Sequence, residues 1–439
     1  MRPKQKQQVV KWRVNKLSER ILKSIRSVMG CRAWCDGGTE FRAGSLSACP
    51  EKCFCHSNIV DCRNIGARTF PHKLQPGVET YFLDENQLTR ISINAFEDVK
   101  TLTYLGLSRN SLHLHNYTFE PLLNLQALEL SGNQLSELQA DLFVNLPNLT
   151  WLSLANNNLK RLSNGIFRSQ MKLTYLDLSN NQVVLLPQTF KHLPQLNTLY
   201  LKNNKLRMLP TIVFSHLLEL EVLDFSSNQL RSLPALFFAN HHKLTDLRLD
   251  FNRLSHLAST LFAYQHALQY LTISGNNIGN FSSKLFSNLT KLLHLDLSNN
   301  SLIRLPLDFV SNLEKLEVLK LSDNFINGFH PGIFRHNLKL SYLHLDRNQL
   351  TSLPVFEGLQ QLEELTLRCN SLVTLPWRFT DNLIGLRCLQ LTDNLISELH
   401  VAMLHVNMTL LLMNNPICST KLQTTSTQST KINCTNRQC

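Results

Sequence analysis

The chain has 439 residues, an apolar content of 43% and a formal net charge of +12 at neutral pH. Nine of its 44 basic residues lie within residues 1–28, where Glu19 is the only acidic residue, so residues 29–439 carry a net charge of only +4. This small charge excludes nucleic-acid binding by the larger part of the chain.

Residues 1–48 form a basic N-terminal segment and a linker, which we predict to be disordered. Apolar residues recur at helical spacing among the basic ones: Val10, Val14, Leu17, Ile21 and Ile25. This pattern is typical of a helix that lies on an anionic membrane, or of a mitochondrial transit peptide. It contains no uninterrupted apolar stretch, so no secretory signal peptide is visible. A further alternative is that the segment does not belong to the mature protein, for instance through a misassigned first exon.

Residues 49–77 are predicted to form a cysteine-rich N-terminal cap. Residues 49–62 read CPEKCFCHSNIVDC and contain Cys49, Cys53, Cys55 and Cys62. Four clustered cysteines form either disulfides in an oxidising compartment or a zinc site. Their position before a repeat array favours a disulfide cap that covers the open end of the array. Spacing alone does not fix which cysteines pair.

Residues 78–417 contain fifteen copies of one pattern, which residues 149–159 (LTWLSLANNNL) show clearly. The alternation across Leu152, Ser153 and Leu154 predicts a short β-strand with one buried face. The asparagine that follows can satisfy backbone groups in the bend, since its amide both donates and accepts hydrogen bonds. It recurs every 21 to 24 residues: Asn86, Asn110, Asn133, Asn157, Asn181, Asn204, Asn228, Asn252, Asn276, Asn300, Asn324, Asn348, Asn370, Asn394 and Asn415.

A second apolar mark follows each asparagine except the last by eight to ten residues. It is phenylalanine in thirteen repeats and Met403 in the fourteenth. A period in this range indicates a solenoid, whose repeats contact only their neighbours. We therefore predict the α/β class: a right-handed solenoid with a curved parallel β-sheet on its concave face and with loops and short helical turns on its convex face. Fifteen strands about 4.8 Å apart give a sheet on the order of 70 Å long.

Residues 418–439 are predicted to form an abbreviated or truncated C-terminal cap. They contain Cys418, Cys434 and Cys439 around a Ser/Thr-rich stretch. Two further cysteines, Cys369 and Cys388, occupy non-equivalent repeat positions, which favours free thiols over a bridge between them. Because the chain has eleven cysteines, at least one is free or pairs with another molecule. No stretch reaches eighteen consecutive apolar residues, so we expect no membrane span in this chain.

The sequence contains no pattern that predicts catalysis, a metal site or a cofactor. GxSxG, HExxH and phosphate-binding glycine loops are absent, and the 16 histidines are scattered. N-glycosylation sequons are weak support for secretion because they also arise by chance. The predicted glycosylation sites are Asn116, Asn148, Asn280, Asn288 and Asn299, and sequons also occur at Asn407 and Asn433.

The strand residues six and four positions before each asparagine are expected to face solvent on the concave side. Exposed aromatic residues near charged ones are typical of a protein-binding surface. The alternative is that strands favour aromatic residues for cross-strand packing alone. The predicted partner-binding residues are Tyr104, Trp151, Tyr175, Tyr200, Asp224, Asp246, Arg248, Tyr270, His294, Tyr342 and His344. The same surface includes Phe82, Asp177, Lys320 and Arg368.

Residues 49–418 resemble the extracellular leucine-rich-repeat superfamily. Similar patterns occur in Toll-type ectodomains, chaoptin-like and connectin-like adhesion proteins, lamprey variable lymphocyte receptors and the large subunit of carboxypeptidase N. The resemblance implies the disulfides Cys49–Cys55 and Cys53–Cys62, and partner recognition on the concave face. The chain departs from the family at Ser419-Thr420, where a second cysteine usually stands, and no tryptophan follows.

These observations predict a non-catalytic extracellular protein, either secreted or the ectodomain of a cell-surface receptor or adhesion protein. Its partner is expected to be a protein ligand or receptor, and a homodimer is an open alternative. Two other interpretations remain: a scaffold or regulatory subunit that stabilises a secreted enzyme, and a cytosolic scaffold. A reducing cytosol would leave the cap cysteines as thiols.

Overall fold

A computed structural model of the chain describes residues 49–71, 74, 76–92, 94–399, 408–419 and 431–434. The chain divides into two units, Met1–Ser47 and Ala48–Cys439, and the second contains all of these residues. The basic segment and linker predicted for residues 1–48 lie outside the described residues, as do Met403, Asn407 and Cys439.

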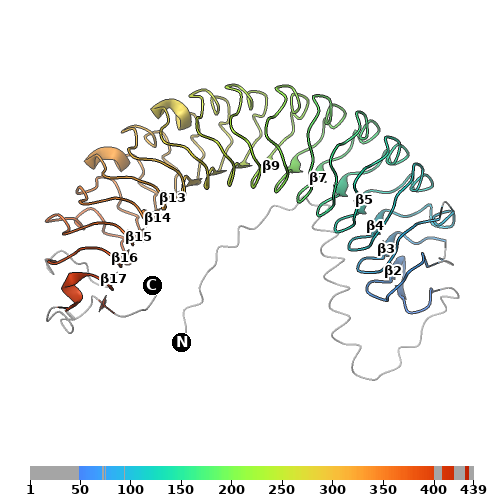
Figure 1. The fold of residues 1–439 in the computed structure, drawn as a ribbon, viewed down its shortest axis with the longest axis horizontal. Helices are drawn as coiled ribbons and strands as arrows, with labels where there is room; N and C mark the ends of the chain where they lie inside the picture. The colour runs from blue at the N-terminus through green and yellow to red at the C-terminus, as the bar shows by residue number, and fades with distance from the viewer. Residues whose placement is uncertain are drawn as a thin grey trace, which may run out of the picture. The chain divides into compact units, whose positions relative to one another are not determined.

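Fifteen parallel strands of three residues each form the repeat array and confirm the predicted solenoid. They are β3 (Thr80–Phe82), β4 (Tyr104–Gly106), β5 (Ala127–Glu129), β6 (Trp151–Ser153), β7 (Tyr175–Asp177), β8 (Thr198–Tyr200), β9 (Val222–Asp224), β10 (Asp246–Arg248), β11 (Tyr270–Thr272), β12 (His294–Asp296), β13 (Val318–Lys320), β14 (Tyr342–His344), β15 (Glu364–Thr366), β16 (Cys388–Gln390) and β17 (Thr409–Leu411). A hairpin of β1 (Phe54–His56) and β2 (Ile59–Asp61) precedes them, and β18 (Lys431–Asn433) follows. The strands lie on the inner, concave side of the arc that this unit forms (Figure 1).

Successive strands pair in identical register, so that equivalent residues of every repeat form columns. Leu152 is the partner of Leu128 on one side and Leu176 on the other, and all three are fully buried. The first and third residues of each strand point to the opposite, concave face because side chains alternate along a strand. The fold therefore dictates the central residue of each triplet and leaves the two flanking residues to other constraints.

The recurrent asparagine closes each turn, as the sequence predicted. The Asn157 amide donates to the carbonyl oxygens of Leu130, Leu154 and Ala155 at 3.0 to 3.2 Å, and its oxygen accepts from Leu135 N at 3.1 Å. The other recurrent asparagines make the equivalent donor bonds to carbonyl groups, as Asn110 and Asn181 illustrate. We call the whole set the ladder asparagines. Loss of one amide would leave buried backbone groups unpaired, each at a cost of about 1–3 kcal/mol.

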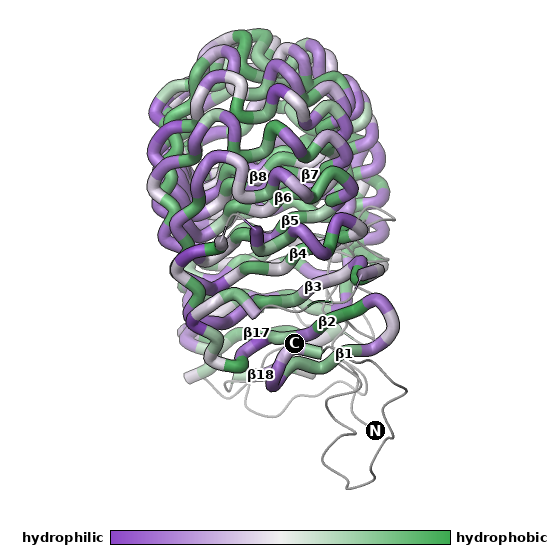
Figure 2. Tube along the Cα trace, turned by 90° about the vertical axis from the view of Figure 1, so that its right-hand side faces the viewer, coloured by the Kyte–Doolittle hydropathy of each residue, from purple (hydrophilic) through white to green (hydrophobic). Residues whose placement is uncertain are grey.

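The recurrent phenylalanine forms a buried column through the interior. Phe143, Phe167, Phe190 and Phe214 are almost fully buried, and neighbouring rings stack with centroids 5.6 to 6.4 Å apart. Each buried side chain of this size contributes roughly 1.5–3 kcal/mol, so stability accumulates with repeat number. Hydrophobic and hydrophilic segments consequently alternate around the turns of the solenoid (Figure 2).

The convex side consists mostly of turns and has almost no helix. Among the described residues, the helices are short 3₁₀ helices: η1 (Ser283–Phe286), η2 (Pro331–Phe334) and η4 (Pro416–Ser419). None of the helices in the described part of the chain is long and apolar enough to cross a membrane.

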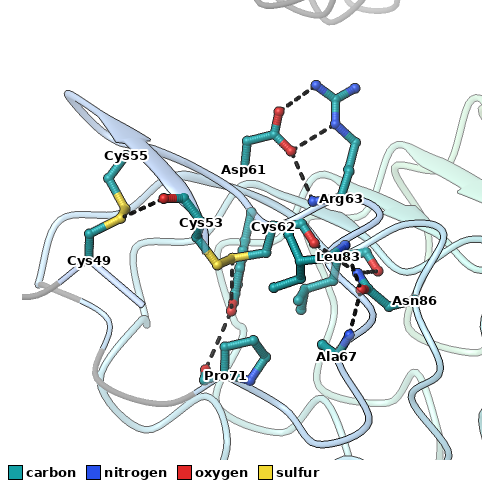
Figure 3. The surroundings of a disulfide bond; sticks show 12 residues. Cys49, Cys53, Cys55, Asp61, Cys62, Arg63, Ala67, Pro71, Leu83 and Asn86 are labelled. Atoms are coloured by element: carbon teal, nitrogen blue, oxygen red, sulfur yellow. Dashed lines mark hydrogen bonds and ion pairs between the residues drawn. A yellow bond between two sulfur atoms is a disulfide. The ribbon is translucent and has the colours of Figure 1, made fainter. Parts of the chain in front are cut away.

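The N-terminal cap contains the disulfides Cys49–Cys55 and Cys53–Cys62, the same pairs that the family resemblance implied (Figure 3). Cys62 is fully buried, and its carbonyl accepts a hydrogen bond from the Asn86 amide at 2.8 Å, which joins the cap to the first repeat. At the other end, the disulfide Cys418–Cys434 connects the last turn to β18.

The two cysteines within the repeats differ from each other. Cys369 is a free, exposed thiol, in agreement with the sequence interpretation. Cys388, in contrast, is disulfide-bonded, so the expectation of a free thiol there was wrong. It occupies the first position of β16, and the repeat pattern itself gives no information about oxidation at that position.

Candidate functional site on the concave face

Four aromatic rings lie on the concave face of β4 to β8. We call Tyr104, Trp151, Tyr175 and Tyr200, with the carboxylates of Glu129 and Asp177 among them, the aromatic–acidic patch. Trp151 stacks on Tyr175 with ring centroids 5.1 Å apart and an interplanar angle of 11°, and Tyr200 meets Tyr175 edge-on at 5.6 Å.

The strand register explains why these rings meet. Trp151 and Tyr175 occupy the same position in adjacent parallel strands and are direct partners in the sheet. Ala127 lies between Tyr104 and Trp151 in the same column, so a small side chain interrupts the row of rings. Lateral stacking leaves the four rings half-buried rather than freely exposed.

The expectation that these positions face solvent was therefore correct only in part. Phe82 is 2% exposed, Asp224 3% and Asp246 8%, so the side chains of these residues are buried. Phe82 is covered by the ring of Tyr104 at 5.1 Å and by the Arg63 guanidinium at 4.7 Å from its centroid. Neighbouring repeats lie so close together that residues on the concave side shield one another.

The carboxylates have a structural role that the sequence interpretation missed. Oxygens of Glu129, Asp177 and Asp224 each accept a hydrogen bond at 2.8 Å from the backbone N–H two residues later, that of Ser131, Ser179 and Ser226 respectively. They satisfy the backbone where the strand ends and the bend begins. An acidic residue followed two positions later by serine is the signal that could have indicated this role.

Burial raises the pKa of the carboxyl groups in this patch. Desolvation brings the pKa of Glu129 to about 7, despite hydrogen bonds from Ser131 that favour its charged form. It also raises the pKa of Asp84, which accepts hydrogen bonds from the backbone and hydroxyl groups of Ser108 at 2.8 and 2.7 Å. Gly106 allows this arrangement, since a Cβ there would collide with the Asp84 carboxylate.

A second group of polar side chains covers the concave face of β11 to β14. We call Tyr270, His294, Lys320, Tyr342 and His344 the histidine–lysine patch. Tyr270 contacts His294 with ring centroids 6.4 Å apart, and Lys320 Nζ lies 3.6 Å from Asp296. Burial, followed by the positive charge of Lys320, lowers the pKa of His294 to about 4, and the same two causes lower the pKa of His344.

Arg248 and Asp246, which were also predicted to bind a partner, pair with each other. Their side chains form an ion pair at 3.1 Å on β10, between the two patches. The concave face therefore brings the predicted aromatic residues into two groups, four rings on β4 to β8 and two tyrosines on β11 and β14, and separates these groups with a neutralised pair.

The structure places the predicted glycosylation sites in different environments. Asn280 and Asn299 are exposed, whereas Asn116 is half-buried. The Asn148 and Asn288 amide nitrogens donate to carbonyl groups of the preceding repeat, Leu123 at 3.0 Å and Ala263 at 2.7 Å. A glycan on either of these nitrogens would replace one of its two hydrogens and add bulk beside a contact between repeats.

Fold, repeated asparagines and capped start together define a leucine-rich-repeat solenoid. The family described as Leucine rich repeat matches residues 76–135, 112–159, 123–183, 147–206, 194–242, 242–302, 294–350 and 314–372, which is more than half of the chain. The chain belongs to this family.

Known proteins are similar to this chain over parts of their length. Leucine-rich repeat-containing protein 3B of Homo sapiens is 34% identical over 107 residues, covering 23% of this chain and 41% of that protein. The chain thus spans less than half the length of this relative.

Among solved structures, a leucine-rich-repeat protein of Leptospira interrogans, LIC12759, has a TM-score of 0.69 at 27% identity, over 78% of this chain and 91% of the other. The structure of the Drosophila Toll–Spatzle complex matches with a TM-score of 0.64 at 24% identity, over 76% of this chain and 50% of the other. The latter likeness is one of fold.

Proposed function

We propose that this protein recognises another protein through its concave face, with the aromatic–acidic patch as the main contact. The observation that carries the proposal is the stacked pair Trp151 and Tyr175, whose half-buried rings are partners on adjacent strands of the concave face. Rigid aromatic side chains lose little conformational entropy on binding and contribute strongly to interfaces.

The chemistry of the patch favours a partner that presents lysine or arginine side chains. A cation can approach the ring face of Trp151 that does not stack on Tyr175, and the carboxylates of the patch attract the positive charge. Asp177 accepts a backbone hydrogen bond from Ser179 and side-chain hydrogen bonds from Ser179 and Tyr175. A carboxylate has about four acceptor positions, so one remains for the partner.

We further propose that the protein works outside the cell and without catalysis. The disulfides of the cap support an oxidising compartment. The related solved structures include a complex that contains the leucine-rich-repeat protein FLRT2 with Latrophilin 3 and Unc5D, matched at 23% identity with a TM-score of 0.58 over 71% of this chain and 96% of the other. No group of side chains suited to a metal ion occurs among the described residues.

The test compares two double variants of the secreted protein for binding to displayed extracellular proteins. Trp151→Ala with Tyr175→Ala should weaken binding to the partner by about a hundredfold, since two anchor residues cost roughly 3 kcal/mol together. Tyr270→Ala with Tyr342→Ala is the matched control and should change binding by less than about threefold.

Both double variants should keep a thermal midpoint close to that of the wild type, because the core is unchanged. Equal affinity of the wild type and the Trp151/Tyr175 variant for the partner would refute the proposed site. A larger loss of affinity in the Tyr270/Tyr342 variant would instead place the main contact on the histidine–lysine patch.

A further inference from the structure

We propose that a groove on one flank of the solenoid binds an extended, neutral oligosaccharide. The residues of this groove come directly after the strand in each repeat. The groove has a volume of about 550 Å³ and crosses five repeats. The buried ladder residues Asn157, Asn181, Asn204 and Asn228 form its floor, and further amides border it. We call it the amide groove; its borders are formed by Asn158, Asn180, Gln182, Asn203, Lys205, Ser227, Gln229 and Phe251.

Two rows of polar side chains border the groove. In the first row, Asn180 and Asn203 each precede a ladder asparagine, and the Asn203 amide donates to the Asn180 oxygen at 2.8 Å. In the second row, Lys205 Nζ donates to the Gln182 oxygen at 2.9 Å. The groove is therefore bordered by pre-arranged amides rather than by independent side chains.

These amides retain capacity for a ligand. Each amide has two N–H donors and an oxygen with two acceptor positions, and the internal bonds use only part of this set. The ladder asparagines of the floor have no free donors for a ligand, because the amide nitrogens of Asn181 and Asn204 each donate to three backbone carbonyl groups. Adjacent hydroxyl groups of a sugar, which donate and accept equally, match the unused donors and acceptors of the borders.

Phe251 provides an apolar surface at one end of the groove. Its side chain is 58% exposed, although one edge of the ring packs against Gly275, where a Cβ would lie 2.5 Å from Cδ1. An exposed ring beside a polar groove suits the C–H face of a pyranose, which is apolar while its edge carries hydroxyl groups. Lys205 is the charged residue among those that line the groove, and no carboxylate lines it, which favours a neutral ligand over a charged polymer.

The spacing of the repeats favours a sugar chain over a peptide. The rows follow the stacked strands, which are about 4.7–4.9 Å apart. An extended peptide advances roughly 3.3 Å per residue, so its groups would lose register with the amides after one repeat. A β-1,4-linked pyranose chain is extended and advances by about one ring per repeat. Its successive rings are turned over, so that each ring presents hydroxyl groups to both bordering rows in alternating order.

The experiment measures binding of cellohexaose and chitohexaose to the full chain by calorimetry and by saturation-transfer NMR. We expect one of the two to bind in the millimolar range, and the curved maltohexaose to bind at least about fivefold more weakly. Asn203→Gly with Phe251→Ala should lower the affinity by roughly tenfold or more, because it removes both an amide and the ring. Glycine is chosen because Asn203 has φ of 52°, which glycine adopts without strain.

Asn414→Gly with Phe325→Ala is the matched control. Asn414 also precedes a ladder asparagine, with φ of 58°, and donates to a side chain of the preceding repeat, while Phe325 is exposed to a similar degree as Phe251. The control should bind the sugar as the wild type does.

Three results would overturn the proposal. The first is that neither sugar binds, and the second is that binding persists in the Asn203/Phe251 variant. The third is that an extended Gly–Ser peptide binds as tightly as the sugar, in a manner that this variant abolishes. None of these results would affect the site proposed on the concave face, since its residues are not changed.

Discussion

The two patches of the concave face stand on the same scaffold but differ in chemistry. Beneath both patches the central leucines, the ladder asparagines and the strand register are equivalent, as Leu152 and Leu295 illustrate. Above them, one patch combines stacked rings with carboxylates, and the other combines histidines with Lys320. The difference shows that the repeat fixes the interior while the first and third strand residues vary independently of it.

Burial acts on the titratable groups of the two patches in opposite directions. It raises the pKa of Glu129 and lowers that of His294, because in both cases it disfavours the charged form. Near neutral pH the folded protein therefore holds Glu129 close to half protonated, whereas the imidazole of His294 is uncharged.

The largest expected effect tests the equivalence of the interiors. Leu152→Ala and Leu295→Ala should each lower the free energy of unfolding by about 2–5 kcal/mol, since both side chains are fully buried at the same strand position. Chemical denaturation followed by circular dichroism measures this. A loss in one variant several times that in the other would show that the interiors beneath the two patches differ.

Glu129 of the aromatic–acidic patch should make the protein less stable as pH rises. The folded pKa of Glu129 is about 7, above its ordinary value of 4.5, so the folded state binds more protons between these values and stability falls as pH increases from about 4.5 to 7. Glu129→Gln should remove this loss and be more stable than the wild type at pH 8 by roughly 1–3 kcal/mol. If the free energies of unfolding of the variant and the wild type differed by a constant amount from pH 4.5 to 8, the raised pKa of Glu129 would be wrong.

The histidine–lysine patch should show the opposite dependence. The folded pKa of His294 is about 4, below its ordinary value of 6.5, so the unfolded state binds more protons and stability falls as pH decreases from about 6.5 to 4. His294→Asn should lessen this acid sensitivity by roughly 1–2 kcal/mol over that interval. Thermal unfolding at several pH values measures it, with His256→Asn, an exposed histidine, as the control.

The smallest effect separates the causes of the His294 shift. Lys320→Met should raise the pKa of His294 towards its ordinary value without restoring it, because burial is the larger cause and Lys320 the next. The loss of the partly exposed ion pair with Asp296 should cost less than about 1 kcal/mol. NMR titration of the imidazole measures the pKa; a full return to the ordinary value would make Lys320, rather than burial, the main cause.

Most of the fold could be predicted because the leucine, asparagine and phenylalanine positions repeat, and their roles follow from burial and hydrogen bonding. The sequence also indicated which residues lie on the concave face. It could not show how deeply they are buried, since shielding of Phe82 and Asp224 depends on the closeness of neighbouring strands. The hydrogen bond from Ser179 to Asp177 follows a local signal, an acidic residue two positions before a serine, whereas the oxidation of Cys388 depends on a contact that no repeat position specifies.

The identical register of three-residue strands has a consequence for engineering and for evolution. The middle residue of each strand packs in the core, and its two neighbours form the concave surface. We therefore expect the triplets WLS of β6 and YLT of β11 to be exchangeable. Transplanting one in place of the other would rewrite part of the recognition surface while the hydrophobic stack beneath stayed intact. Binding preference can therefore diversify one turn of the coil at a time.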